Sequence, residues 1–217
     1  MAEEGFRRRP RRDEAPAPPW VPKTEIGQKV ASGEIGSLDQ IYAMGKMPLE
    51  LEIVDKLLPG LREEVLGVET TQRTTDCGRK ISFRAIVAIG DGIGYVGIGA
   101  GKSAEVRPAI ASAIKDAKRH LIKVNLGCGS WECLCGGKHT VPVKLVGRGG
   151  SVRVTIQPGP RGLGIAGNET VRKVLELAGV KDVWTFSKGR TRSVYNMACA
   201  VVDALDLLNH MKTRTEW

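Results

Sequence analysis

The sequence predicts an α+β protein made of two compact units, the first ordered helix, strand, strand, strand, helix and the second strand, strand, helix, strand, helix. Three observations support this prediction. Apolar residues alternate from residue 81 to 89, which is typical of a strand. Apolar residues at helical spacing follow from residue 106 to 121, and a second mixed pattern begins after residue 138. The length of 217 residues suits two domains of about 150 residues or fewer.

Composition divides the chain into five parts. Residues 1–45 form an N-terminal extension, a partly disordered arm whose arginine cluster is nearly balanced by acidic residues, so a solvated tail and an RNA-contacting arm both remain open. The first unit spans 46–125, and a linker rich in Cys and Gly spans 126–137. The second unit spans 138–212, and a short tail occupies 213–217.

The first unit opens with a short helix over 48–58, followed by a strand over 64–70. A polar, basic loop is expected from 72 to 80, before the alternating strand. The return strand, Tyr95 to Ala100, carries glycine at every second position on one side. A strand face without side chains lets a helix or a phosphate backbone approach closely. The last helix begins between Ser103 and Pro108, and its expected buried stripe is Val106, Ile110, Ala113, Ile114, Ala117 and Leu121.

In the second unit we expect strands over 139–146 and 151–157, joined by a glycine-rich hairpin turn. The loop 158–168 is too rich in glycine for a regular element. Asn168 then caps a helix that runs to Ala178. A strand from Asp182 to Phe186, a basic turn and a long final helix complete the unit.

The charge distribution indicates a polyanionic partner. The net charge is +9, and residues 61–125 and 138–217 carry the excess. Positive charge that resides in folded units favours nucleic acid bound by domains rather than by a loose tail. No apolar run approaches the roughly 18 residues of a membrane span, and the N-terminus lacks an apolar signal core, so we expect a cytoplasmic protein.

Five cysteines, an odd number, fit a reducing compartment. Three of them precede a histidine in the pattern Cys128-x4-Cys133-x-Cys135-x3-His139. Three thiolates and an imidazole form an accepted structural zinc set, although the single-residue spacing between two of the cysteines is uncommon. A structural zinc and a loop of incidental reduced thiols are therefore both open. RNA binding itself requires no cofactor.

Several glycine motifs imitate nucleotide sites. Gly92-x-Gly94-x-x-Gly97 matches the dinucleotide pattern, but a strand rather than a helix is expected after it. Gly101-Lys102-Ser103 lacks the first glycine of a P-loop, because position 96 is valine. Pro158-x-x-x-Gly162-Leu163-Gly164 looks like the phosphate loop of small-molecule kinases of the galactokinase type, so a phosphotransferase stays an alternative. No triad or paired-carboxylate set argues for catalysis, and we expect no enzyme.

Long motifs in a fixed order carry a family resemblance: GDGIGYVGIGAGKSAEVRPAI, HTVPVKLVGRGGSVRV, PGPRGLGIAGN and LAGVKDVWTFSKG. The chain resembles the universal small-ribosomal-subunit protein number five family, archaeal type, whose eukaryotic counterpart is small-subunit protein number two. The resemblance implies a first domain like a double-stranded-RNA-binding fold and a second with a left-handed βαβ unit. It also implies a ribosomal RNA-binding protein of the small subunit, cytoplasmic, that contributes to subunit assembly and translational accuracy. The implied neighbours are the fourth and eighth small-subunit proteins and mRNA near the channel through which it enters.

Basic side chains in loops and at strand ends are the candidate RNA contacts, because they neutralise phosphates. They are Arg73, Arg79, Lys80, Arg84, Lys102 and Arg107 in the first unit, and Arg148, Arg153, Arg161, Lys188, Arg190 and Arg192 in the second. The alternative for each of these residues is an ordinary solvated surface charge with no RNA contact. A free-standing regulator that binds double-stranded RNA remains a second functional hypothesis.

Overall fold

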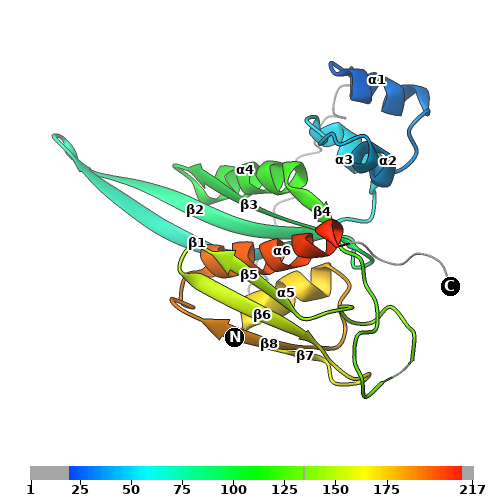
Figure 1. Ribbon diagram of the computed structural model, residues 1–217. Helices are drawn as coiled ribbons and strands as arrows, with labels where there is room; N and C mark the ends of the chain where they lie inside the picture. Colours follow the sequence, from blue (N-terminus) through cyan, green and yellow to red (C-terminus); the bar gives the residue numbers. More distant parts are fainter. Residues whose placement is uncertain (1–19, 134, 212–217) are drawn as a thin grey trace, which may run out of the picture.

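The computed structural model describes residues 20–133 and 135–211 and arranges them in four layers (Figure 1). From top to bottom in Figure 1 these are helix α4, a first sheet of four strands, helices α5 and α6, and a second sheet of four strands. The expectations for residues 1–19 and for the tail at 213–217 lie outside the described residues. Within those that are described, no helix combines the length and the apolar character needed to cross a membrane.

The residues before the first sheet form a small helical module: the helix expected over 48–58 is present, and residues 24–45, which were expected to be an arm, form two further helices. Its helices are α1 (Glu25–Ser32), α2 (Leu38–Ala43) and α3 (Leu51–Leu57). They share a core that contains Val30, Leu38, Ile41 and Ile53. Helices this short are marginal alone, so tertiary packing supplies their stability. The module is fastened to the first sheet by Tyr42, whose hydroxyl donates to the Leu121 carbonyl at 2.8 Å.

The first sheet is antiparallel and has the order β1-β2-β3-β4. Its strands are β1 (Arg62–Thr75), β2 (Gly78–Gly90), β3 (Tyr95–Ser103) and β4 (Leu121–Lys123). The polar loop expected over 72–80 is wrong: β1 and β2 stay paired to Thr75↔Gly78 and project past the helices as a long ribbon (Figure 1). Polar residues can form a strand here because a ribbon with both faces in water needs no apolar alternation.

The bare glycine face of β3 is covered by α4 (Val106–Arg119). A Cβ added at Gly99 would lie 2.2 Å from the Ala117 nitrogen and 2.3 Å from the Ala113 oxygen. Of the two partners expected for this face, a helix and a phosphate backbone, the structure therefore places the helix there. Because α4 lies so close to β3, the residues that it buries differ from the predicted stripe. The fully buried residues are Ala109, Ala113 and Ala117, whereas Val106, which was expected in the stripe, is 38% exposed. Ser103 ends β3, and Glu105 occupies the N-cap position.

The second sheet has the order β5-β6-β8-β7. Its elements are β5 (Leu145–Gly149), β6 (Val152–Pro158), β7 (Ile165–Ala166), α5 (Glu169–Leu177), β8 (Val183–Lys188) and α6 (Val194–His210). The predicted α+β order is confirmed in both units apart from two short additional strands, β4 after α4 and β7 inside the glycine-rich loop. A strand was expected over 139–146, but residues 139–144 do not belong to one, and β5 begins only at Leu145.

Strands β7 and β8 are parallel and joined by α5, which makes them a βαβ unit. Helices α5 and α6 pack against both sheets. One continuous core joins Val96 and Ile98 of the first sheet to Leu175 of α5, Leu205 of α6 and Ile156 of the second sheet. The first sheet is therefore buried on both faces, whereas the helices cover only one face of the second sheet.

Candidate functional site

Cations gather on one face of the projecting ribbon. Register places Arg73 opposite Lys80 on β1 and β2, and Arg84 opposite Lys102 on β2 and β3. Residues two apart on a strand share a face, so these four lie on the face that α6 covers further along the sheet. Arg73, Lys80 and Lys102 line a hollow of about 440 Å³ together with polar side chains. Like charges placed this close are unfavourable unless an anion binds between them.

Three other predicted contacts of the first unit lie apart from that hollow. Arg79 pairs with Thr74 and so points to the opposite face of the ribbon. Arg107 is exposed in the first turn of α4. Arg84 is half-buried, and its guanidinium lies 4.6 Å from the centre of the Tyr195 ring at the start of α6. A cation–π contact of this kind links the first sheet to α6, so Arg84 also has a structural role.

The second sheet carries a row of cations across its open face. Arg148 pairs with Arg153, and Arg153 pairs with Lys188, so three strands present three cations side by side. All three residues are exposed. The next rows of the same face hold Phe186, 53% exposed, and Trp184, 42% exposed. The face is thus both cationic and aromatic.

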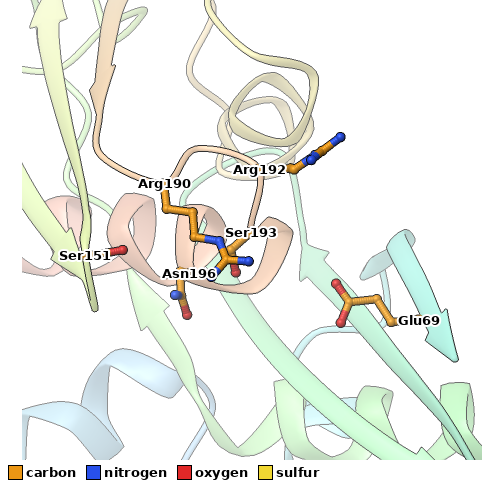
Figure 2. Close-up of a pocket in the computed structure, with 6 residues that line it drawn as sticks. All are labelled: Glu69, Ser151, Arg190, Arg192, Ser193 and Asn196. Atoms are coloured by element: carbon orange, nitrogen blue, oxygen red, sulfur yellow. The ribbon is translucent and has the colours of Figure 1, made fainter. Parts of the chain in front are cut away.

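The turn after β8 brings the last two arginines to a cleft between the two units. This cleft of about 500 Å³ is lined by Arg190, Arg192, Ser151, Ser193, Asn196 and Glu69. Figure 2 shows Arg190 directed toward Ser193 and Asn196, Arg192 pointing away from them, and Glu69 on the far wall. Glu69 belongs to β1 and pairs with Arg84 in the sheet. The basic turn therefore adjoins the base of the projecting ribbon.

The predicted cations share a further property. Among the residues that the structure describes, none of the twelve forms an ion pair with a carboxylate, whereas other lysines do. Lys123 pairs with Asp39 at 2.8 Å, and Lys173 pairs with Glu169 at 3.1 Å and Glu64 at 3.3 Å. Most other described Lys and Arg residues also lack an ion pair, so what distinguishes the cations of the ribbon, the open face and the basic turn is that they lie close together, where an external anion can bind several of them.

The structure brings the Cys3His set together. The ligand atoms of Cys128, Cys133, Cys135 and His139 all lie within 4.8 Å of one another. The sulfurs of Cys128 and Cys135 are 3.5 Å apart, and Cys133 Sγ lies 3.6 Å from His139 Nε2. A tetrahedral zinc would set these separations at about 3.8 Å and about 3.5 Å. The four side chains therefore fit a tetrahedral metal ion.

The imidazole of this cluster is oriented by a buried carboxylate. His139 Nδ1 lies 2.9 Å from Asp182 Oδ2, which leaves Nε2 facing the sulfurs. The other oxygen, Asp182 Oδ1, accepts backbone N–H groups from Gly162 at 3.0 Å and Gly164 at 2.9 Å. Burial disfavours the carboxylate, but the N–H groups and His139 hold the pKa of Asp182 below its usual value. A carboxylate behind a histidine is the usual outer partner of a zinc ligand.

The cluster also favours a thiolate, the form that binds metal. The hydrogen bond from the Cys135 thiol, opposed by desolvation and assisted by His139, lowers the pKa of Cys128 to about 7. Cys135 and then the backbone N–H of Arg161 lower the pKa of Cys133. The remaining cysteines lie elsewhere: Cys77 is exposed at the ribbon tip, and Cys199 is half-buried on α6.

The nucleotide motifs have other roles in the fold. Asp91 Oδ1 accepts the N–H groups of Ile93, Gly94 and Tyr95, which makes the dinucleotide-like glycines a turn between two strands. In the loop that resembles a phosphate loop, the N–H groups of Gly162 and Gly164 already bind Asp182. An inner carboxylate there would repel a phosphate, which disfavours the phosphotransferase hypothesis.

Sequence reasoning did not find Asp182 or Tyr195. Asp182 lies 43 residues from His139, so no local spacing connects them. Tyr195 meets Arg84 only because α6 packs under the first sheet. A pairing of this kind depends on tertiary structure, and the sequence offered no signal for it.

Comparison with known proteins agrees with this architecture. Residues 61–125 match the family described as ribosomal protein S5, N-terminal domain, and residues 147–215 match ribosomal protein S5, C-terminal domain. The chain is 49% identical over 194 residues to small ribosomal subunit protein uS5 of Methanoregula boonei, covering 89% of this chain and 95% of that protein. It is 51% identical over 194 residues to the uS5 protein of Methanosphaera stadtmanae, covering 89% and 86% respectively.

Proposed function

Because the chain belongs to the ribosomal protein S5 family, it is a structural, non-enzymatic constituent of the small ribosomal subunit, and we propose that its unpaired cations bind the subunit's ribosomal RNA. The observation that carries this proposal is the clustering of cations on the ribbon, the open sheet face and the basic turn, where none of them forms an ion pair with a described carboxylate. Cations without an internal partner gain most from phosphates, since binding releases counterions.

The geometry supports recognition by shape rather than by base sequence. The ribbon is two strands wide and exposed along 72–80, so it can enter between RNA segments, whereas the open sheet face offers a flat surface. A-form RNA presents phosphates and 2′-hydroxyls to such surfaces. The exposed Trp184 and Phe186 add apolar contact area that suits a neighbouring protein or an unpaired base.

Sedimentation separates this function from the two alternatives. We expect the endogenous protein to sediment with small subunits on a sucrose gradient and to leave them only at high salt. A free-standing double-stranded-RNA-binding regulator would remain in the light fractions and bind arbitrary duplexes. A phosphotransferase would show heat on titration with ATP and magnesium, which we expect to be absent. Recovery only in the light fractions would contradict the proposal.

The finer partners follow from the family. We propose that the protein resides in the cytoplasm and contacts the fourth and eighth small-subunit proteins and mRNA near the channel through which it enters. Through these contacts it would contribute to subunit assembly and to translational accuracy. The aromatic rows around Phe186 are the surface best suited to a protein neighbour. Cross-linking of intact subunits followed by mass spectrometry tests this: cross-links from this face to neither protein would contradict it.

We propose further that Cys128, Cys133, Cys135 and His139 hold a structural zinc. The support is the tetrahedral fit of the ligand atoms and the oriented imidazole. The ion would cross-link residues of the linker to the start of the second unit, and RNA contact would not pass through it. Elemental analysis of the purified chain should give one zinc per protein. Less than a tenth of an equivalent in freshly purified protein would contradict the assignment.

A further inference from the structure

We propose that the Cys3His centre, beyond cross-linking the linker, sets the conformation of the glycine-rich loop 158–167 and so positions Arg161 for RNA contact; the inference rests on the proposed zinc site. Arg161 is exposed, and the two glycines that follow it in the loop donate hydrogen bonds to Asp182, the carboxylate behind His139.

The connection between the metal cluster and the loop runs through Asp182. Its Oδ2 holds His139 Nδ1, and its Oδ1 binds the N–H groups of Gly162 and Gly164, the residues just after Arg161. A metal ion on Nε2 would fix the imidazole ring, the ring would fix the carboxylate, and the carboxylate would fix the two glycine amides. Asp182 thus acts as a positioning residue that contacts neither the metal ion nor RNA.

The loop needs such support because its own sequence gives it little. Gly162 has φ +89° and Gly164 has φ +74°, and a Cβ at either would meet nothing within 4 Å. Glycine in open space lowers the barrier to other conformations and raises the entropy lost on ordering. Between Pro160 and Gly164 the backbone is otherwise held by the Val183 N–H to the Gly164 carbonyl and by a turn from Leu163 to Pro160, whereas the ends of the loop are fixed by Gly159, which donates to Thr140, and by β7, which pairs with β8.

Hydrogen exchange of the full chain tests the loop. Peptides covering 158–167 are followed with zinc bound and after removal of zinc by a chelator. We expect exchange at the amides of Gly162 and Gly164 to become at least about tenfold faster without zinc, because hydrogen bonds that open locally lose their protection. Peptides from β6 and from the ribbon are the controls and should not change. If the protein binds zinc but the loop exchanges at the same rate with and without it, the inference is overturned, whereas the assignment of the zinc site is not affected.

RNA binding supplies the second readout. Zinc removal should weaken the affinity of the wild-type chain for small-subunit ribosomal RNA roughly three- to tenfold, the range of one charge-assisted contact. The exposed variant Arg161→Gln should already bind that much more weakly, and zinc removal should not weaken it further. An equal additional loss in Arg161→Gln would show that the centre acts elsewhere and would overturn the inference. A chain that retains no zinc overturns the metal assignment and this inference together, while RNA binding would still stand.

A positioning variant sharpens the result. Asp182→Asn keeps all four ligands, so zinc should still bind, about ten- to a hundredfold more weakly. With zinc bound, its loop should exchange as fast as that of the zinc-free wild type. Protection equal to that of the wild type with zinc bound would contradict the role of the carboxylate. If this variant does not fold, the comparison of wild-type chain with and without zinc decides the matter.

Discussion

The two sheets expose their cations in different ways because different amounts of each sheet are covered. The first is packed between α4 and the pair α5 and α6, and its candidate RNA-binding cations lie toward the end of the sheet where β1 and β2 run past the helices, beside Lys102 of β3. The second is covered on one face, and its cations form a row across the other. Helix placement therefore determines whether a sheet binds RNA with a projecting ribbon or with a flat face.

The largest expected effect tests the burial of the first sheet. In Gly99→Ala the new Cβ would lie 2.2 Å from the Ala117 nitrogen, so α4 must move away from β3. We expect a loss of about 3 kcal/mol in the free energy of unfolding, measured by urea denaturation. Gly67→Ala is the matched control, since its Cβ meets only Val194 at 3.8 Å, and it should change stability by less than about 0.5 kcal/mol. Equal effects would contradict the close packing.

The second prediction concerns the row on the open face. Replacing Arg148, Arg153 and Lys188 by glutamine should weaken binding to small-subunit RNA and lower the magnitude of the slope of log affinity against log salt by about 2 to 3. The free protein should not be destabilised, because cross-strand repulsion is relieved.

Its control is Lys173→Gln, which removes a cation already paired with Glu169 and Glu64. Its salt slope should match that of the wild type. A slope that changes as much for Lys173→Gln as for a residue of the row would show that net charge, and not position, governs binding.

The third prediction tests the ribbon. Arg73→Gln with Lys80→Gln should lower the magnitude of the salt slope by about 2, a smaller effect than in the row because two cations are removed rather than three. Urea unfolding should stay the same, since both residues are exposed and unpaired with acids within the described chain. An unchanged slope would exclude the ribbon from RNA contact and leave the open face as the main surface.

The smallest effect concerns the helical module, which contacts the first sheet through Tyr42 and helix α4 through Asp55. Tyr42→Phe removes the hydrogen bond to Leu121 and should cost about 1 kcal/mol at neutral pH. Burial and then the nearby Asp39 raise the pKa of Tyr42 to about 12. A raised pKa means that the stabilisation is complete below the ordinary value near 10 and is lost as pH rises through 12. The difference in unfolding free energy between wild type and variant should therefore shrink over that range; a constant difference would contradict this assignment.

Regular patterns made much of this fold predictable. Alternation found the buried half of β2, and the spaced glycines of β3 predicted a close neighbour, which proved to be α4. The ribbon over 72–80 was mistaken for a loop because polarity normally indicates solvent, and a two-stranded ribbon is solvated on both faces. Strand β7 is two residues long and shows no period.

Part of each candidate site could also be predicted from the sequence. The ligand types alone identified the metal cluster, whose side chains do converge. The individual RNA contacts remain predictions, although register places several of them side by side. Asp182 could not be found, because its role arises from contacts with His139 and two glycine amides that are distant in sequence.

The claim that unpaired cations hold ribosomal RNA is tested most directly by ultraviolet cross-linking of intact small subunits, with the cross-linked peptides of this chain identified by mass spectrometry. We predict RNA cross-links in peptides from the ribbon, the open face of the second sheet and the turn at Arg190, and few around the paired Lys173. Cross-links concentrated around Lys173, or absent from all three cationic surfaces, would contradict the account.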